Sequence, residues 1–219
     1  MNKLLSVKNI KKNYNTTDGE IEAIKNISFD VNEGDFVAIV GSSGCGKSTL
    51  LSIISALEKS TSGEIIFYKD NPIIGYMLQE DALFNHLTIY ENIILGLKIL
   101  GIDNKDNIEY AVNLLEKYDL SKFKDKYPNE LSGGMKQRVA LIRTLAIKPD
   151  LLLLDEAFSA LDFTTRLSVN DDVYKVIKNL NKTTIMVTHD LNEAISMADK
   201  IIILSSRPAK VKRLIDISI

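Results

Sequence analysis

A glycine-rich stretch with a lysine and two hydroxyl residues fits the phosphate-binding pattern G-x-x-x-x-G-K-[ST]. Its members are Gly41, Ser42, Ser43, Gly44, Cys45, Gly46, Lys47, Ser48 and Thr49. Glycines let the backbone curl closely around phosphate, and the N-terminus of a following helix adds partial positive charge. The pattern predicts that Lys47 reaches the β- and γ-phosphates, that Ser48 holds Mg²⁺ and that Thr49 bonds the α-phosphate. The alternative is a plain Gly/Ser turn, which accounts poorly for the Lys-Ser pair and for the flanking sequence.

Two acids and a histidine each follow an apolar run of the kind that forms a buried strand. Asp155 and Glu156 come directly after Leu151–Leu154, and His189 follows the run 184–187. Ligands of open parallel sheets bind outside the carboxyl ends of the strands. We therefore expect Asp155 to fix Mg²⁺ through water, Glu156 to polarise the attacking water and His189 to donate to the γ-phosphate. The alternatives are an acid pair at a helix N-terminus and a structural histidine.

Two further residues are candidates for nucleotide contacts. Gln79 lies just past the predicted strand 73–77, at the sheet edge where it is placed to touch Mg²⁺ or the attacking water. Tyr14 lies in the polar stretch 11–15, and its ring is able to stack on a purine base. The alternative for Tyr14 is an ordinary half-exposed strand tyrosine.

A second glycine-rich turn, Leu131–Arg138, opens another predicted helix. Ser132 is a plausible N-cap, and Gly133 and Gly134 follow it. The start of this helix is a second anion site, with Ser132 and the Gly134 N–H as donors. A chain with one phosphate loop has no obvious need for a second. We therefore expect this one to serve the ATP of another subunit in a head-to-tail dimer.

The elements that must position these residues follow from hydrophobic periodicity. Residues 1–35 read as antiparallel strands, because residues 27–31 alternate between apolar and polar. Apolar runs without alternation predict strands that are covered on both faces, at 36–40, 151–154, 184–187 and 201–204. Apolar residues at helical spacing predict helices at 89–100, 107–118 and 135–147.

These elements predict an α/β fold, namely a P-loop NTPase (RecA-like) core with an antiparallel β subdomain and an inserted α-helical subdomain. We expect one domain over residues 1–219. About 1–79 and 148–219 form the nucleotide-binding core with its β subdomain, and about 80–147 form the helical subdomain.

Composition excludes several classes of protein. The 219 residues carry a net charge of −2, which gives no basic field for nucleic acid. No apolar run approaches the roughly 18–20 residues that span a bilayer, and the start lacks the apolar core of a signal peptide. We expect a soluble, cytoplasmic protein whose membrane role comes through a partner. The single cysteine, Cys45, fits a reducing compartment, and its place near a helix N-terminus predicts a reactive thiol that ATP protects.

The motifs together resemble those of ATP-binding cassette (ABC) ATPases over essentially the whole chain. Leu131–Gln137 resembles the family's signature sequence, and the phosphate loop, Gln79, Leu151–Glu156, Ser159–Asp162 and His189 stand in the family's order. The resemblance implies that Tyr14 stacks on adenine, that Gln79 is the Q-loop glutamine and that Asp162 lies in the D-loop. Asp162 also suits a helix N-cap, and both roles are compatible.

The resemblance implies an ATPase, with ATP and Mg²⁺ as cofactors, that powers an ABC transporter. Residues 79–83 and 193–200, followed by Ser206–Pro208, are similar to the nitrate/sulfonate/taurine importer ATPases. The implied partners are a second cassette in an ATP-dependent homodimer or a paired cassette, a transmembrane permease and an extracytoplasmic solute-binding protein, with no nucleic acid. The implied location is the inner face of the cell membrane, held there by the permease.

Two alternatives and one departure accompany this prediction. A soluble ABC ATPase that acts on DNA or ribosomes usually carries a coiled-coil insertion, zinc-binding cysteines or two cassettes, and none is present here. An exporter component stays open. The segment Leu83–Leu87 lacks the Pro-Trp pair common in the importer group, so partner specificity is expected to differ there.

Overall fold

The computed structural model describes residues 2–17, 19–159 and 163–217. The chain divides into two compact units. The first unit comprises Met1–Pro72 and Asn181–Ile219, and the second comprises Ile73–Leu180.

The strands of the first unit are hydrogen-bonded in the order β4-β1-β2-β9-β8-β3-β7. Their bounds are β1 Lys3–Thr16, β2 Gly19–Asn32, β3 Phe36–Val40, β4 Ser62–Phe67, β7 Thr183–Thr188, β8 Lys200–Leu204 and β9 Ala209–Asp216. Helices α1 (Lys47–Ile54) and α6 (Leu191–Met197) belong to the same unit.

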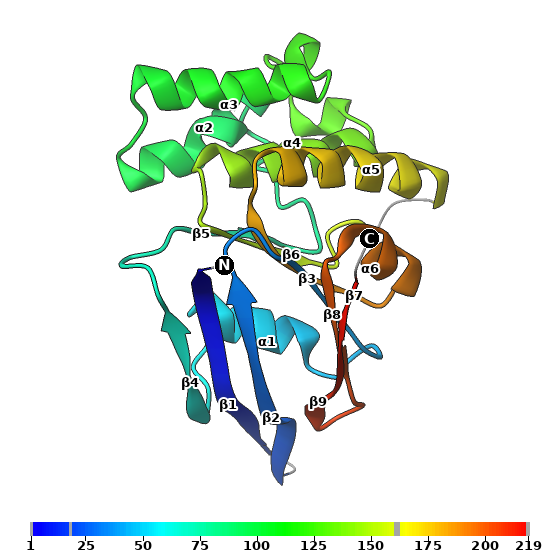
Figure 1. Ribbon diagram of the computed structural model, residues 1–219. Helices are drawn as coiled ribbons and strands as arrows, with labels where there is room; N and C mark the ends of the chain where they lie inside the picture. Colours follow the sequence, from blue (N-terminus) through cyan, green and yellow to red (C-terminus); the bar gives the residue numbers. More distant parts are fainter. Residues whose placement is uncertain (1, 18, 160–162, 218–219) are drawn as a thin grey trace. The chain divides into compact units, whose positions relative to one another are not determined.

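Strands β1, β2 and β4 form the antiparallel part that the alternating pattern predicts, and Figure 1 shows them side by side in blue and cyan. Alternation follows from burial, since Ile27, Phe29 and Val31 are buried while the residues between them are exposed or half-buried. Strand β4 begins with a close approach to β1 at Gly63. That residue has φ of +86°, and a Cβ on it would overlap the carbonyl groups of Lys8 and Asn9.

Strands β3, β7 and β8 are parallel to one another, and every residue of β3 and β7 is buried. Burial of the whole strand explains the continuous apolar runs of β3 and β7, and three of the five residues of β8 are buried as well. The predicted strands at 36–40, 184–187 and 201–204 are confirmed. Strand β9 was not predicted. It runs antiparallel to β8 and pairs in parallel with β2 at Ile24 and Ala209, so it joins the two parts of the sheet in this unit.

The second unit contains two parallel strands, β5 (Ile74–Met77) and β6 (Leu151–Asp155), and a group of helices. The helices are α2 Ile89–Leu100, α3 Lys105–Lys117, the 3₁₀ turns Ser121–Phe123 and Pro128–Glu130, α4 Gly133–Ala146 and α5 Phe163–Asn179. Helix α2 has the predicted bounds because Thr88 and Glu91 form a capping box and Gly101 ends the last turn. The predicted helices of residues 80–147 are therefore confirmed, with small changes at their ends.

Among the described residues, no helix combines the length and the apolar character needed to cross a membrane.

Candidate active site

The phosphate loop of the first unit connects β3 to α1 and is shaped for an anion. Gly46 caps α1 with φ of +115°, and an added Cβ would lie 3.3 Å from the carbonyl oxygen of Ala23. Only glycine takes this conformation without strain. No side chain caps the first turn of α1, so the partial positive charge at that end faces the loop. The loop therefore fits a phosphate group.

Lys47 folds back across this loop. Its Nζ donates to the carbonyl oxygens of Gly41 at 3.1 Å and Ser42 at 3.3 Å, and the residue is 4% exposed. Ser48 is exposed and Thr49 is half-buried at the start of α1. The Lys47 ammonium thus already lies against the loop whose N–H groups would meet phosphate.

Cys45 is 1% exposed, which corrects the expectation of a readily reactive thiol. A buried sulfur is out of reach of an alkylating reagent. Its Sγ lies 2.8 Å from the position of a Cβ on Gly41, so the thiol fills space inside the loop.

His189 leaves the sheet at the same edge as the phosphate loop. Val40 and Thr188 are register partners in the parallel pair β3–β7, so Gly41 and His189 both follow the last paired residue of their strands. His189 is exposed, and Asp190 next to it caps α6 by accepting from the N–H groups of Asn192 and Glu193. The structure therefore places His189 at the expected edge.

Tyr14 lies on β1 within the same unit as the phosphate loop. Its hydroxyl donates to Oε2 of Glu58 at 2.8 Å, and the side chain of Thr49 is near enough to lower the pKa of Tyr14. The ammonium of Lys12 lies 4.8 Å from the ring centroid. Partial burial is the main cause that raises the pKa of Tyr14 above its ordinary value. Tyr14 is thereby hydrogen-bonded to the segment that follows α1, and its hydroxyl lies beside the first turn of that helix.

The second unit carries the two acids and Gln79 at one edge. Met77 and Leu154 are register partners in the parallel pair β5–β6, so Gln79 lies just past β5 at the edge where β6 ends with Asp155 and Glu156 follows. The amide nitrogen of Gln79 lies 3.4 Å from the Ser159 hydroxyl. Within this unit the structure thus brings together the residues that were expected to share a sheet edge.

Asp155 and Glu156 differ in their surroundings. Asp155 is 7% exposed and accepts a hydrogen bond of 2.9 Å from the hydroxyl of Tyr76. Glu156 is half-buried and has φ of +45°, a left-handed conformation that costs energy in a residue with a side chain. Backbone strain of this kind is commonly retained where it aims a side chain at a functional site.

The second glycine-rich turn forms the start of α4, as predicted. Ser132 is the N-cap, and its Oγ accepts from the Met135 N–H at 3.4 Å. Ser132 and Gly133 are exposed, whereas Gly134 is buried. The N-terminus of α4 is therefore open to a ligand that comes from outside the unit. Asp162 lies outside the described residues.

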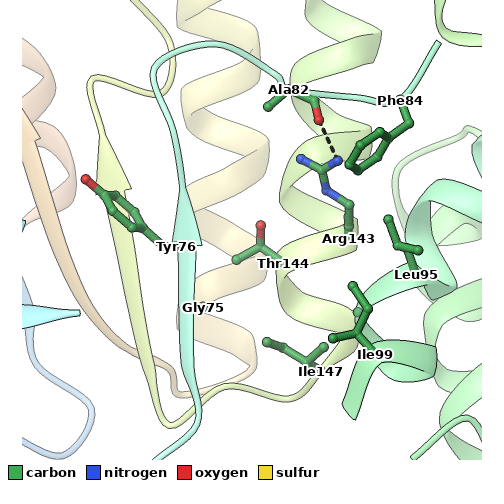
Figure 2. Close-up of a pocket in the computed structure, with 10 residues that line it drawn as sticks. Gly75, Tyr76, Ala82, Phe84, Leu95, Ile99, Arg143, Thr144 and Ile147 are labelled. Atoms are coloured by element: carbon green, nitrogen blue, oxygen red, sulfur yellow. Dashed lines mark hydrogen bonds between the residues drawn. The ribbon is translucent and has the colours of Figure 1, made fainter. Parts of the chain in front are cut away.

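An apolar groove in the second unit has a volume of about 270 Å³ (Figure 2). Phe84, Leu95, Ile99 and Ile147 line it, and Figure 2 shows them around one opening beside Thr144. Phe84 is 46% exposed and Ile99 is 75% exposed.

Arg143 fixes one wall of this groove. Its guanidinium donates to the carbonyl oxygens of Asp81 at 2.9 Å and Ala82 at 2.8 Å, and the second of these bonds is drawn in Figure 2. Burial lowers the pKa of Arg143, against the raising effect of the Asp81 charge. Helix α4, whose N-cap is Ser132, thus also holds the segment that follows Gln79.

Sequence reasoning missed several residues that support the site: Lys12, Glu58, Tyr76 and Arg143. Only Lys12 could have been found from the sequence, because it lies two residues before Tyr14 and so shares its face of β1. The others are distant in sequence from the residues they contact.

The family model and the similar proteins of known sequence or structure all indicate one family. Residues 24–159, more than half of the chain, match the family described as ABC transporter. The uncharacterized ABC transporter ATP-binding protein YtlC of Bacillus subtilis (strain 168) is 44% identical over 218 residues, which cover 97% of this chain and 84% of the relative. The aliphatic sulfonates import ATP-binding protein SsuB of Bacillus cereus (strain ZK / E33L) is 39% identical over 217 residues, covering 97% and 85% of the two chains.

Among solved structures, the fold is similar to a dimeric, post-hydrolysis state of the ATP-binding cassette MJ0796 bound to ADP and Pi. The TM-score is 0.83 at 33% identity, over 98% of this chain and 99% of that one. This similarity confirms the predicted P-loop α/β fold with an antiparallel β subdomain and a helical region. The chain belongs to the ABC transporter family and is one of its ATP-binding proteins, which hydrolyse ATP.

Proposed function

We propose that this ATPase powers the uptake of a small anion or organic solute, such as a sulfonate, nitrate or taurine. The observation that carries the ATP chemistry is the pairing of Val40 with Thr188, because it sets the phosphate loop and His189 at one edge of the first unit. Support for import comes from relatives whose names refer to import of aliphatic sulfonates and of sulfate/thiosulfate. A choline transport relative of similar identity indicates that the solute varies within this group.

In the first unit, we assign base stacking to Tyr14 and phosphate binding to the loop Gly41–Thr49. Lys47 exchanges its two carbonyl partners for the β- and γ-phosphates, since an ammonium gains more from phosphate charge than from neutral carbonyls. Thr49 bonds the α-phosphate, and His189 donates to the γ-phosphate.

In the second unit, Glu156 orients and polarises the attacking water. Gln79 and Asp155 of this unit offer amide and carboxylate oxygens, the hard donors that suit Mg²⁺. In the first unit, Ser48 offers a hydroxyl oxygen of the same kind. When bound, Mg²⁺ supplies positive charge that offsets the charge of the β- and γ-phosphates. Catalysis then rests on positioning and electrostatics, with no covalent intermediate on the protein.

The start of α4 serves the nucleotide of a second subunit. Ser132 and Gly133 are exposed at a helix N-terminus, where a γ-phosphate from a partner gains the Ser132 hydroxyl and the first-turn N–H groups. Two chains in head-to-tail contact complete both sites, and ATP shifts the population from open subunits to the closed dimer. Asp162, which lies outside the described residues, is assigned the coupling of the two sites that the resemblance implies.

The groove next to Phe84 and Ile99 receives the permease. A short apolar helix from a membrane partner would bury side chains that are exposed in the isolated chain. The chain is thereby held at the inner face of the cell membrane, and a solute-binding protein delivers the cargo from the other side.

The test is the oligomeric state of Glu156→Gln, measured by size-exclusion chromatography with light scattering. We expect a monomer without nucleotide, a dimer with Mg-ATP and a loss of about 10²–10⁴-fold in turnover, the usual contribution of a positioned base. Hydrolysis by this variant at the parent rate would show that Glu156 is not the base.

Two double variants test whether loss of the dimer is specific to the start of α4 or follows from any added surface charge. Adding Ser132→Arg to Glu156→Gln blocks the start of α4, so the ATP-dependent dimer is lost. Adding Ser121→Arg, at an exposed position of the same unit, leaves the dimer intact. A dimer that survives Ser132→Arg contradicts the assigned role of α4.

A further inference from the structure

Glu58 uses both of its carboxylate oxygens to hold two residues of β1. Oε1 lies 2.9 Å from Nζ of Lys12, and Oε2 accepts a 2.8 Å hydrogen bond from the Tyr14 hydroxyl. Lys12 also donates to the carbonyl oxygen of Lys59 at 2.8 Å. The segment that follows α1 is thus fastened to β1 at the candidate base-stacking residue.

Lys12 and Tyr14 are also in contact with each other. The Lys12 ammonium lies over the ring, 4.8 Å from its centroid, so one face of the tyrosine is already covered by a cation. A base can therefore stack only on the opposite face. A ring with one covered face and a tethered hydroxyl has lost most of its rotational freedom, which lowers the entropic cost of stacking.

The Tyr14 hydroxyl also lies near the side chain of Thr49, which acts to lower the pKa of Tyr14. Thr49 belongs to the first turn of α1 and is the last residue of the loop to which we assign phosphate binding. The hydroxyl of Tyr14 therefore binds the segment after α1 through Glu58 and lies beside the last residue of the phosphate loop.

We infer that Glu58 is a positioning residue for the nucleotide base, which acts together with Lys12 by fixing the Tyr14 ring against the phosphate loop. The inference rests on the proposed binding of ATP at Tyr14 and the loop. It adds that Glu58 affects binding of the base only, whereas the loop binds the phosphates.

The charge state of Glu58 supports this role. Burial alone would raise the pKa of its carboxyl, but the hydrogen bonds from Lys12 and Tyr14 and the charge of Lys12 outweigh burial, and the pKa is lowered. The carboxylate is consequently charged at neutral pH and able to hold both partners at once.

The experiment compares two probes by isothermal titration calorimetry on the full chain: Mg-ATP, and Mg-tripolyphosphate, which lacks base and sugar. For Glu58→Gln we expect the Kd of Mg-ATP to rise about three- to tenfold, the usual range for a lost charged hydrogen bond and a loosened cation–π contact. The Kd of Mg-tripolyphosphate should stay unchanged.

Two further variants make the assignment specific. Tyr14→Phe removes only the hydroxyl and should raise the Kd of Mg-ATP by a similar factor, with no further rise in the double variant with Glu58→Gln. Glu64→Gln is the matched control, because Glu64 pairs with Lys8 at 3.8 Å on the same sheet without contact to Tyr14. It should bind both probes as the parent chain does.

Each other outcome has a definite meaning. Equal weakening of both probes by Glu58→Gln, or an unchanged Kd for Mg-ATP, overturns the inference while ATP binding itself stands. Failure of the parent chain to bind Mg-ATP would instead overturn the proposed function. Circular dichroism and thermal unfolding of each variant show whether a weakened Kd reflects loss of folding.

Discussion

The side chain of Asn92 exchanges two hydrogen bonds with the backbone of Phe84. The Phe84 N–H donates to Oδ1 of Asn92 at 2.9 Å, and Nδ2 of Asn92 donates to the Phe84 carbonyl at 3.1 Å. The same Nδ2 reaches the carbonyl oxygens of Leu87 and Thr88 at 3.1 and 3.0 Å. One fully buried amide thus holds the turn that presents Phe84 to the groove.

Replacing Asn92 by alanine should cost about 2–4 kcal/mol in free energy of unfolding, because it leaves buried backbone groups without partners. Urea unfolding followed by circular dichroism measures the loss. Asn104→Ala is the control, because it removes an exposed N-cap of α3 and should cost about 1 kcal/mol. Equal losses in the two variants would mean that the Asn92 network contributes no more than an ordinary cap.

Gly63 and Gly101 both have positive φ but differ in the space around them. A Cβ on Gly63 would overlap the carbonyl groups of Lys8 and Asn9, whereas nothing lies within 4 Å of a Cβ on Gly101. We expect Gly63→Ala to destabilise the fold by about 2–4 kcal/mol and Gly101→Ala by about 1 kcal/mol, the cost of the conformation alone. Their urea midpoints should separate accordingly, and coinciding midpoints would contradict the predicted clash between β1 and β4.

The parts of the fold that sequence predicts well are those whose signals are contiguous. The phosphate loop is one run of residues between a buried strand and a helix, and the bounds of α2 follow from Thr88, Glu91 and Gly101. A run of neighbouring residues carries its own conformational preference, so no knowledge of tertiary contacts is needed.

The remaining features depend on contacts that have no local signal. Arg143 donates to the backbone carbonyls of Asp81 and Ala82. Every residue has a backbone carbonyl, so the sequence does not show which residues accept these bonds. Glu58 meets Tyr14 across 44 positions of sequence, after a turn whose direction is set by packing. Burial of Cys45 inside its loop likewise follows from tertiary structure, which is why a helix N-terminus alone gave the wrong prediction for its thiol.

Tyr76→Phe tests the support of Asp155. The phenol donates to Oδ2 of Asp155 at 2.9 Å, so its loss leaves a buried carboxylate less well oriented. We expect the Mg²⁺ concentration for half-maximal ATPase activity to rise about three- to tenfold, since removing a supporting partner of a ligand weakens metal binding. Tyr110→Phe, on α3 in the same unit, is the control and should keep the parent Mg²⁺ dependence. If the Mg²⁺ concentration for half-maximal activity is unchanged in Tyr76→Phe, this hydrogen bond does not support metal binding.

Ile99→Asp tests the groove as the permease site. Ile99 is 75% exposed at the groove, and a carboxylate there would have to lose its hydration when an apolar helix docks. The ATPase activity of the isolated chain should stay at the parent level, because Ile99 belongs to none of the motifs assigned to ATP. Co-purification with the permease from membranes should fall at least about tenfold, the effect of a charge left unpaired in an interface. Leu57→Asp places the same charge at a residue that is 72% exposed in the other unit, and it should leave co-purification intact. If both variants co-purify like the parent chain, the permease binds elsewhere, and if both fail, added negative charge alone is responsible.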